Sequence, residues 1–217
     1  MEQEHTYLEE KVNPFFSIWF STRKTVRYVV DHKPLKYSLI IAAIAGIPNA
    51  LNAAGELSKT FNLSFWLLIL GALILGPIFG LIGWGISTVA YTLVGKWLGG
   101  FGTYKEMGKA MGVVLIPLIW MTPYWILSFL FAYNGTYQID PTSGFTSGGV
   151  IWMIVSSLIM IILSIWIIFI QSKAIGEVHQ FSSLRGFGTL IIPSIVLGVL
   201  VFIIMMIILF AAIGYVG

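Results

Sequence analysis

The stretch FWLLILGALILGPIFGLIGWGISTVAYTLVGK, residues 65–96, carries no charge before its final lysine. A helix of this length that is apolar on every side is typical of a membrane span rather than of a soluble core. Small side chains recur along one face, and such faces let helices pack closely in lipid. We therefore expect this segment to be the central helix of a membrane bundle, with packing positions at Gly76, Gly80 and Gly83. The whole small face comprises Ala72, Gly76, Gly80, Gly83, Ser87 and Ala90.

The composition indicates the same class of protein. The 217 residues are 58% hydrophobic and 10% charged, whereas soluble domains contain about 25% charged residues. We expect an all-α membrane protein, a five-helix transmembrane bundle with a short amphipathic interfacial N-terminal helix. The net charge of +3 arises from basic residues in particular loops, so we expect no nucleic-acid partner. The chain has no cysteine, which excludes disulfides and thiolate chemistry.

Five apolar runs are each long enough to cross a hydrocarbon core of about 30 Å at about 1.5 Å per residue. We expect residues 1–12 to be a disordered cytoplasmic tail without a signal peptide, 13–34 to be an interfacial segment, and 35–217 to be the membrane domain. The apolar runs are Leu35–Ala54, Phe65–Gly95, Gly108–Tyr133, Val150–Gln171 and Gly188–Val216.

Residues 13–34 combine aromatic and basic side chains, a composition that suits the surface of a membrane. Asn13 and Pro14 are typical of a helix start. A second helix should start at Ser21 or Thr22 and end near Lys33, because Pro34 follows. Its basic residues are expected to bind lipid headgroups, or else to serve only as a topology signal. They are Arg23, Lys24, Arg27, Lys33 and Lys36.

The distribution of lysine and arginine predicts the orientation of the chain in the membrane. With five spans, eleven of the twelve basic residues fall on one side, and Lys59 alone falls on the other. Positive charge is enriched in cytoplasmic loops. We expect a multi-pass protein of the cell membrane with a cytoplasmic N-terminus and an external C-terminus.

Several stretches resemble the bacterial branch of the Yip (Ypt/Rab-interacting) family of integral membrane proteins. They are NPFFSIWFSTRKTVRYVVDHKP at 13–34, the glycine-rich second span, FGTYKEMGKAMGVVLIP at 101–117 and GEVHQFSSLRGFGTLIIP at 176–193. The resemblance implies five spans and a non-enzymatic role in organising membrane or protein partners. Eukaryotic members, as the resemblance implies, assist vesicle traffic through a long cytosolic N-terminus with an acidic-Leu-Tyr-Gly-Pro motif. This motif is not found here, so we do not transfer Rab binding.

Three spans that begin on the same side carry an Ile-Pro pair, at residues 47–48, 116–117 and 192–193. Around two of them, a basic residue, a glycine and Ile-Pro recur with the same spacing, from Lys109 and from Arg185. The repeat predicts a common proline kink. The alternative is chance, since proline is frequent in membrane helices.

Polar side chains in the first two spans form a candidate site. Asn49, Asn52 and Glu56 share one helical face, and ionisable groups at membrane depth are candidates for function. With Ser87 and Tyr91 they predict a polar path, as in a small transporter, channel or lipid-translocating protein. The alternative is that Gly55 ends the first span and Glu56 is solvated. For the hydroxyls, the alternative is hydrogen bonding between helices.

No sequence pattern indicates catalysis. We find no hydrolase, metalloprotease or nucleotide-binding motif, so we expect no enzyme activity, catalytic residue, metal or cofactor. His179 lies two residues from Glu177, and we expect both to lie in a solvated loop. The leading hypothesis is a scaffold or adaptor that binds membrane lipids and self-associates or binds other membrane proteins. The competing hypothesis is transport along the polar path.

Overall fold

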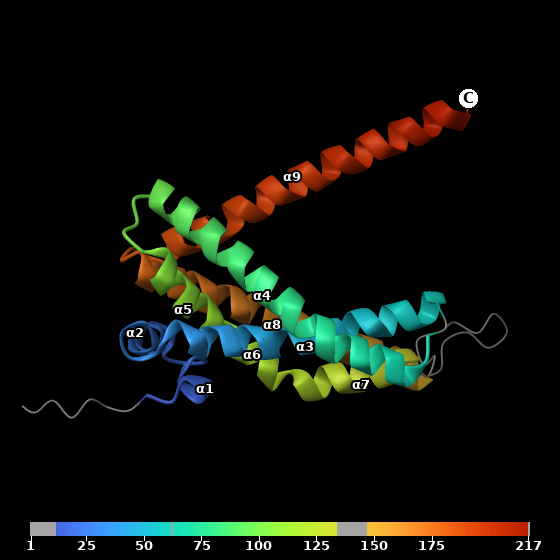
Figure 1. Cartoon of the computed structure of the whole chain (residues 1–217), viewed down its shortest axis with the longest axis horizontal. Coiled ribbons are helices and arrows are strands. Elements are labelled where there is room, and N and C mark those ends of the chain that lie inside the picture. Colours follow the sequence, from blue (N-terminus) through green and yellow to red (C-terminus); the bar gives the residue numbers. More distant parts are fainter. Residues whose placement is uncertain (1–11, 62, 134–146, 217) are drawn as a thin grey trace, which may run out of the picture.

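The structure, a computed structural model, describes residues 12–61, 63–133 and 147–216, and every regular element in these ranges is a helix (Figure 1). Four helices are long and apolar enough to cross a membrane, or five if one bent helix pair forms a single span. The predicted all-α bundle of membrane spans is thus confirmed. The expected disordered tail falls outside the described residues, apart from Val12.

Two short helices, α1 (Pro14–Ser17) and α2 (Thr22–His32), precede the spans. The side chain of Asn13 accepts a hydrogen bond from the N–H of Phe15, as an N-cap does. Lys33 is the C-cap of α2, where the following proline predicts the helix to end. The apolar face of α2 packs against α5 and α8, so this segment is part of the bundle.

The first two spans are α3 (Leu35–Phe61) and α4 (Phe65–Trp97). Helix α3 continues through Gly55, so the alternative in which this glycine ends the helix of the first span is wrong. A glycine within a helix costs only about 1 kcal/mol, and good helix formers follow it. Helix α3 packs against α4, α5, α6 and α7, whereas α4 packs against α3, α5 and α9. The central helix is therefore α3 rather than α4.

The third apolar run is broken into α5 (Tyr104–Val114), α6 (Ile116–Trp120) and α7 (Thr122–Tyr133). A capping box between Thr103 and Glu106 starts α5. Pro117 lies in the first turn of α6, and the chain bends by 52° before α7. The other two Ile-Pro pairs lie inside the continuous helices α3 and α9, so the three prolines do not share one local structure.

The last two spans are α8 (Ser147–Val178) and α9 (Ser183–Val216). Helix α9 packs on α8 and α4 near its start and then leaves the bundle (Figure 1). Its large side chains from Ile195 to Phe210 are mostly exposed. Such a surface is stable in hydrocarbon and would be very costly in water.

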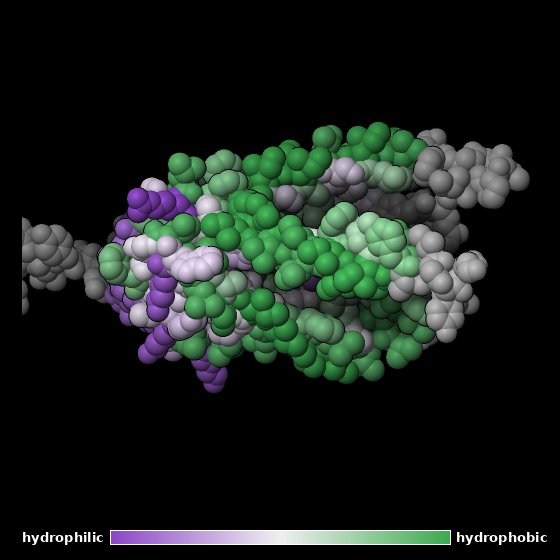
Figure 2. Space-filling view, turned by 90° about the horizontal axis from the view of Figure 1, so that it is seen from above, coloured by the Kyte–Doolittle hydropathy of each residue, from purple (hydrophilic) through white to green (hydrophobic). Residues whose placement is uncertain are grey.

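Hydrophilic residues gather at one end of the molecule, whereas hydrophobic residues cover most of the rest of the visible face (Figure 2). This polar end contains α2, the start of α5 and the link between α8 and α9. The main buried core also lies here, and it joins Val26 and Val29 of α2, Met107 of α5 and Ile175 of α8. Tight packing is thus concentrated at the polar end.

Candidate functional site

The side chain of His179 lies at the centre of the polar end. It follows α8 directly and is only 1% exposed. Its Nδ1 accepts a hydrogen bond from the N–H of Gly102 at 3.1 Å, and its Nε2 lies 3.1 Å from the carbonyl oxygen of Tyr91. The second contact requires a proton on Nε2, so the ring is the neutral Nε2–H tautomer. The prediction of a solvated histidine is wrong.

A set of glycines leaves room for this ring. Side chains at Gly95, Gly100 or Gly102 would run into His179 or its neighbour Val178. The cluster of glycines between residues 95 and 102 is the sequence signal that could have indicated a close approach. Burial lowers the pKa of His179 below its usual value of 6.5, although the hydrogen bond to Tyr91 acts in the opposite direction. With both nitrogens held by backbone groups, the ring is suited to joining helices rather than to proton transfer.

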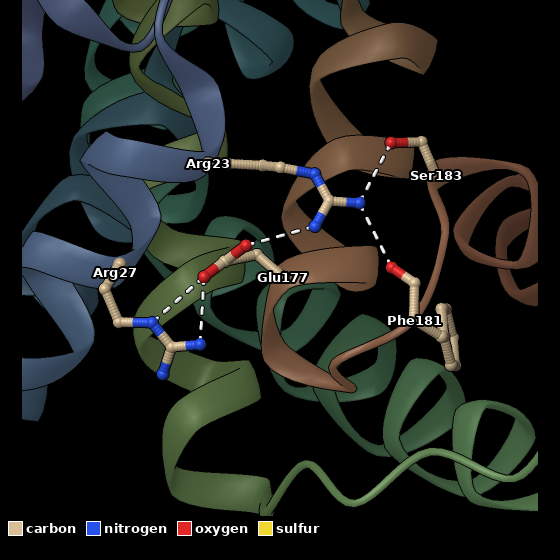
Figure 3. Close-up of polar contacts among 5 residues, drawn as sticks. All are labelled: Arg23, Arg27, Glu177, Phe181 and Ser183. Carbon is tan, nitrogen blue, oxygen red and sulfur yellow. Dashed lines mark hydrogen bonds and ion pairs between the residues drawn. The ribbon is translucent and has the colours of Figure 1, made fainter.

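A second cluster joins α2 to α8, and Figure 3 shows it in detail. The Glu177 carboxylate accepts a hydrogen bond from Nη1 of Arg23 at 3.1 Å. It also accepts one from Nε of Arg27 at 2.9 Å, and Nη2 of Arg27 lies at the same distance as an ion-pair partner. Nη2 of Arg23 also donates to the carbonyl oxygen of Phe181 and to Oγ of Ser183, both at 3.1 Å. The Glu177 side chain is 17% exposed, so it is largely buried between α2 and α8. The prediction that Glu177 lies in a solvated loop is therefore wrong.

The five basic residues predicted to bind headgroups have different surroundings. Arg23 and Arg27 are engaged by Glu177. The Lys33 ammonium lies over the rings of Tyr28 and Tyr37, at 5.8 and 5.7 Å from their centroids. Lys24 and Lys36 have exposed side chains. Lys24 and Lys36 are therefore better placed to reach a lipid surface than the two arginines, whose guanidinium groups are held by Glu177.

A cavity of about 350 Å³ lies between α3, α4, the α5–α6 region and α8. It brings together Asn49, Ser87 and Tyr91 from the predicted polar site, and Gln171, which the sequence analysis did not single out. Asn52 and Glu56 do not line it. Sequence spacing within single helices could not have placed Gln171 beside Asn49, because the two residues lie on different spans.

The polar groups of this cavity are only partly satisfied. Oγ of Ser87 donates a hydrogen bond to the carbonyl oxygen of Gly83. The side-chain amide of Asn49 donates one to the carbonyl oxygen of Ala45 at 3.4 Å. The Gln171 amide and the Tyr91 hydroxyl have no hydrogen-bond partner within the described ranges. Most of the wall is apolar, so the cavity could hold an amphiphile that offers one or two hydrogen-bonding groups.

The three predicted packing glycines divide into two groups. A Cβ on Gly76 would lie 2.8 Å from Cα of Ile47, and one on Gly80 would lie 2.9 Å from Cα of Gly46. Both glycines therefore lie where α3 approaches α4 most closely. Nothing lies within 4 Å of the corresponding position on Gly83, which instead borders the cavity.

The described residues contain no group of three or more potential metal-ligating side chains. The candidate sites are thus the polar end and a small cavity within the spans, and neither presents a nucleophile paired with a base among the described residues.

The chain was compared with models of known protein families. The model of the Yip1 domain matches residues 16–215, which is nearly the whole chain. No curated protein and no solved structure matches.

Proposed function

Since this chain belongs to the Yip1 family of multi-pass membrane proteins, which are generally non-enzymatic, we propose that it is a scaffold that organises membrane lipids or other membrane proteins at its polar end. The observation that carries the proposal is the clamp of Arg23 and Arg27 on Glu177. It fixes the amphipathic helix α2 to the spans, so the polar end is a preformed surface.

The charge of this surface supports the choice of partner. Exposed lysines of the polar end include Lys24, Lys36 and Lys105. Each basic residue near an anionic membrane surface contributes about 1 kcal/mol to binding. A partner with acidic groups, or the headgroup layer itself, is therefore the matching surface.

The orientation and location belong to the same proposal. Basic residues are concentrated at the polar end, and cytoplasmic loops are the ones enriched in such residues. We place the polar end and the N-terminus in the cytoplasm and the C-terminus outside, in the cell membrane of a bacterium.

The proposal is tested in native membranes. The protein is extracted with its surrounding lipids into polymer-bounded discs, and the recurrent membrane proteins and lipids are identified by mass spectrometry. The variant K24E/K36E/K105E should lose them, because its surface charge is reversed, whereas N49A/Q171A should keep them. Equal recovery from the wild type and the charge-reversed variant would contradict the scaffold.

A second candidate function is translocation of a small amphiphile or lipid, the competing hypothesis from the sequence. It is favoured by the cavity that brings Asn49, Ser87 and Tyr91 together with Gln171. The test is to measure the rate of lipid flipping between leaflets in vesicles that contain the purified protein and a fluorescent phospholipid in both leaflets. A scaffold leaves flipping at the rate of protein-free vesicles, whereas a translocator accelerates it and loses that activity in N49A/Q171A.

A further inference from the structure

A groove of about 440 Å³ lies between the end of α8 and the start of α9. Its walls come from residues 165–173 of α8 and 183–187 of α9. It is separate from the cavity between α3 and α4, and it contains none of the residues that the sequence indicated as headgroup ligands.

The groove lies beside the place where α8 and the start of α9 pack closely, before the two helices diverge. At Gly186 a Cβ would run into the carbonyl oxygen of Ser172, so the two helices meet there at backbone distance. Beyond this contact α9 turns away from the bundle (Figure 1). The space between the diverging helices is therefore open towards the surroundings of the spans.

The lining of the groove changes character along its length. The apolar walls of the groove come from Ile165, Phe169 and Phe187. Its other end is polar and is lined by Lys173 and Ser183. Residues 165 and 173 are about 12 Å apart along the helix. An occupant therefore needs an apolar chain and a polar, anionic head at one end of it.

Charge at the polar end of the groove is unbalanced. Lys173 is exposed, and no hydrogen bond or ion pair joins its ammonium group to another described residue. Glu177 is the one acidic residue in the sequence between 147 and 216, and its carboxylate is held by Arg23 and Arg27. Arg185 adds a further exposed positive charge. An anionic group is thus attracted here without a competing carboxylate.

We propose that this groove binds one anionic phospholipid, with an acyl chain between α8 and α9 and the phosphate at Lys173. Basic pockets between spans at the cytoplasmic side are known to suit anionic headgroups. The apolar length of the groove selects a membrane lipid over a free phosphate. The site goes beyond the proposed scaffold function, and it would exist in a translocator as well.

Native mass spectrometry with added phosphatidylglycerol or phosphatidylcholine tests the site. The full-length protein should retain one phosphatidylglycerol in preference to phosphatidylcholine. K173E should weaken this binding by about tenfold or more, because it replaces attraction with repulsion. I165W should weaken it with the charge unchanged, since the indole occupies the groove. The matched control K96E reverses an exposed lysine at the end of α4, outside the proposed binding surfaces, and should bind as the wild type does.

Wild-type binding by both K173E and I165W would overturn the site, and so would an equal loss in K96E. A phosphatidylglycerol with a photoreactive acyl chain gives a measurement that needs no variant. Cross-links should fall in residues 165–187. Cross-links spread evenly over the spans, or competition by soluble glycerophosphoglycerol as strong as by the lipid, would show that no such groove-bound lipid exists.

Discussion

Gly102 donates its backbone N–H to Nδ1 of His179 across 77 positions of the sequence, at 3.1 Å. The opposite nitrogen of the same ring lies 3.1 Å from the carbonyl oxygen of Tyr91. One neutral imidazole thereby joins α4, the turn after it and the end of α8. Stability of the polar end should consequently depend on the protonation of this ring.

Acidification should destabilise the protein through His179. Because burial lowers its folded-state pKa, the unfolded chain takes up a proton first as the pH falls below about 6.5. The stabilising contribution is complete above that pH and is lost as the pH falls through the folded pKa. Thermal unfolding in detergent from pH 8 to pH 5 measures this loss.

The variant H179A should unfold more easily by about 2–4 kcal/mol at pH 8, since it removes a buried side chain and two hydrogen bonds. It should also flatten the acid-dependent part of the stability curve. The exposed His32 provides a comparison, because H32A removes no buried side chain and should cost less stability at pH 8 than H179A. An unchanged pH dependence in H179A would assign the effect to other groups.

Removal of the Glu177 charge should release α2 from α8. In E177Q the two guanidinium groups lose their shared carboxylate, and because both arginine side chains are more than a third exposed, the expected cost is only about 1 kcal/mol. Hydrogen exchange of residues 22–32 should accelerate while that of α4 stays unchanged. The variant K105Q removes a charge at the same end without a clamp, and faster exchange of α2 there would show a general charge effect.

Alanine at Gly76 or Gly80 should destabilise the bundle, although alanine is the better helix former by about 1 kcal/mol. The reason is that a Cβ at either position would collide with the α3 backbone. Gly85 lies on the same helix with nothing within 4 Å of its Cβ position, so G85A should be neutral or stabilising. Unfolding in a graded mixture of mild detergent and dodecyl sulfate ranks the three variants. Equal behaviour of all three would mean that α3 and α4 are not closely packed.

A fusion series should locate the C-terminus and the loop after the second span. Alkaline phosphatase, which folds only outside the cytoplasm, should be active after Gly217 and inactive when joined after Gly100 of a truncated chain. A green fluorescent protein at the same two points should show the reverse pattern, because the positive loops stay in the cytoplasm. Fluorescence after Gly217 would require either the opposite orientation or an even number of spans.

Local sequence signals predicted several helix boundaries correctly. Asn13 and Pro14 marked the start of α1, the proline after Lys33 marked the end of α2, and Phe65 began the second span in both prediction and structure. These features depend on neighbours within one turn of the chain. Gly55 was misjudged because its neighbours favour a helix more strongly than one glycine disfavours it.

The candidate sites depended on contacts between distant segments. Spacing along α3 grouped Asn49 with Asn52 and Glu56, which do not line the cavity, and it gave no sign of Gln171, which does. His179 was expected to be solvated because nothing near it in sequence shows that glycines from residues 95–102 surround it. Periodicity reports the direction of a side chain on its own helix, and it carries no information about which other helix lies there.

The sequence by itself determined that this is a helical membrane protein with long apolar spans and one basic side, since hydropathy and charge are summed along the chain. The tertiary structure decided that α3 is central, that Gly76 and Gly80 pack against it while Gly83 borders a cavity, and that α9 diverges from α8. Each of these depends on the closest approach of two backbones, which is fixed by side-chain volumes on both helices at once.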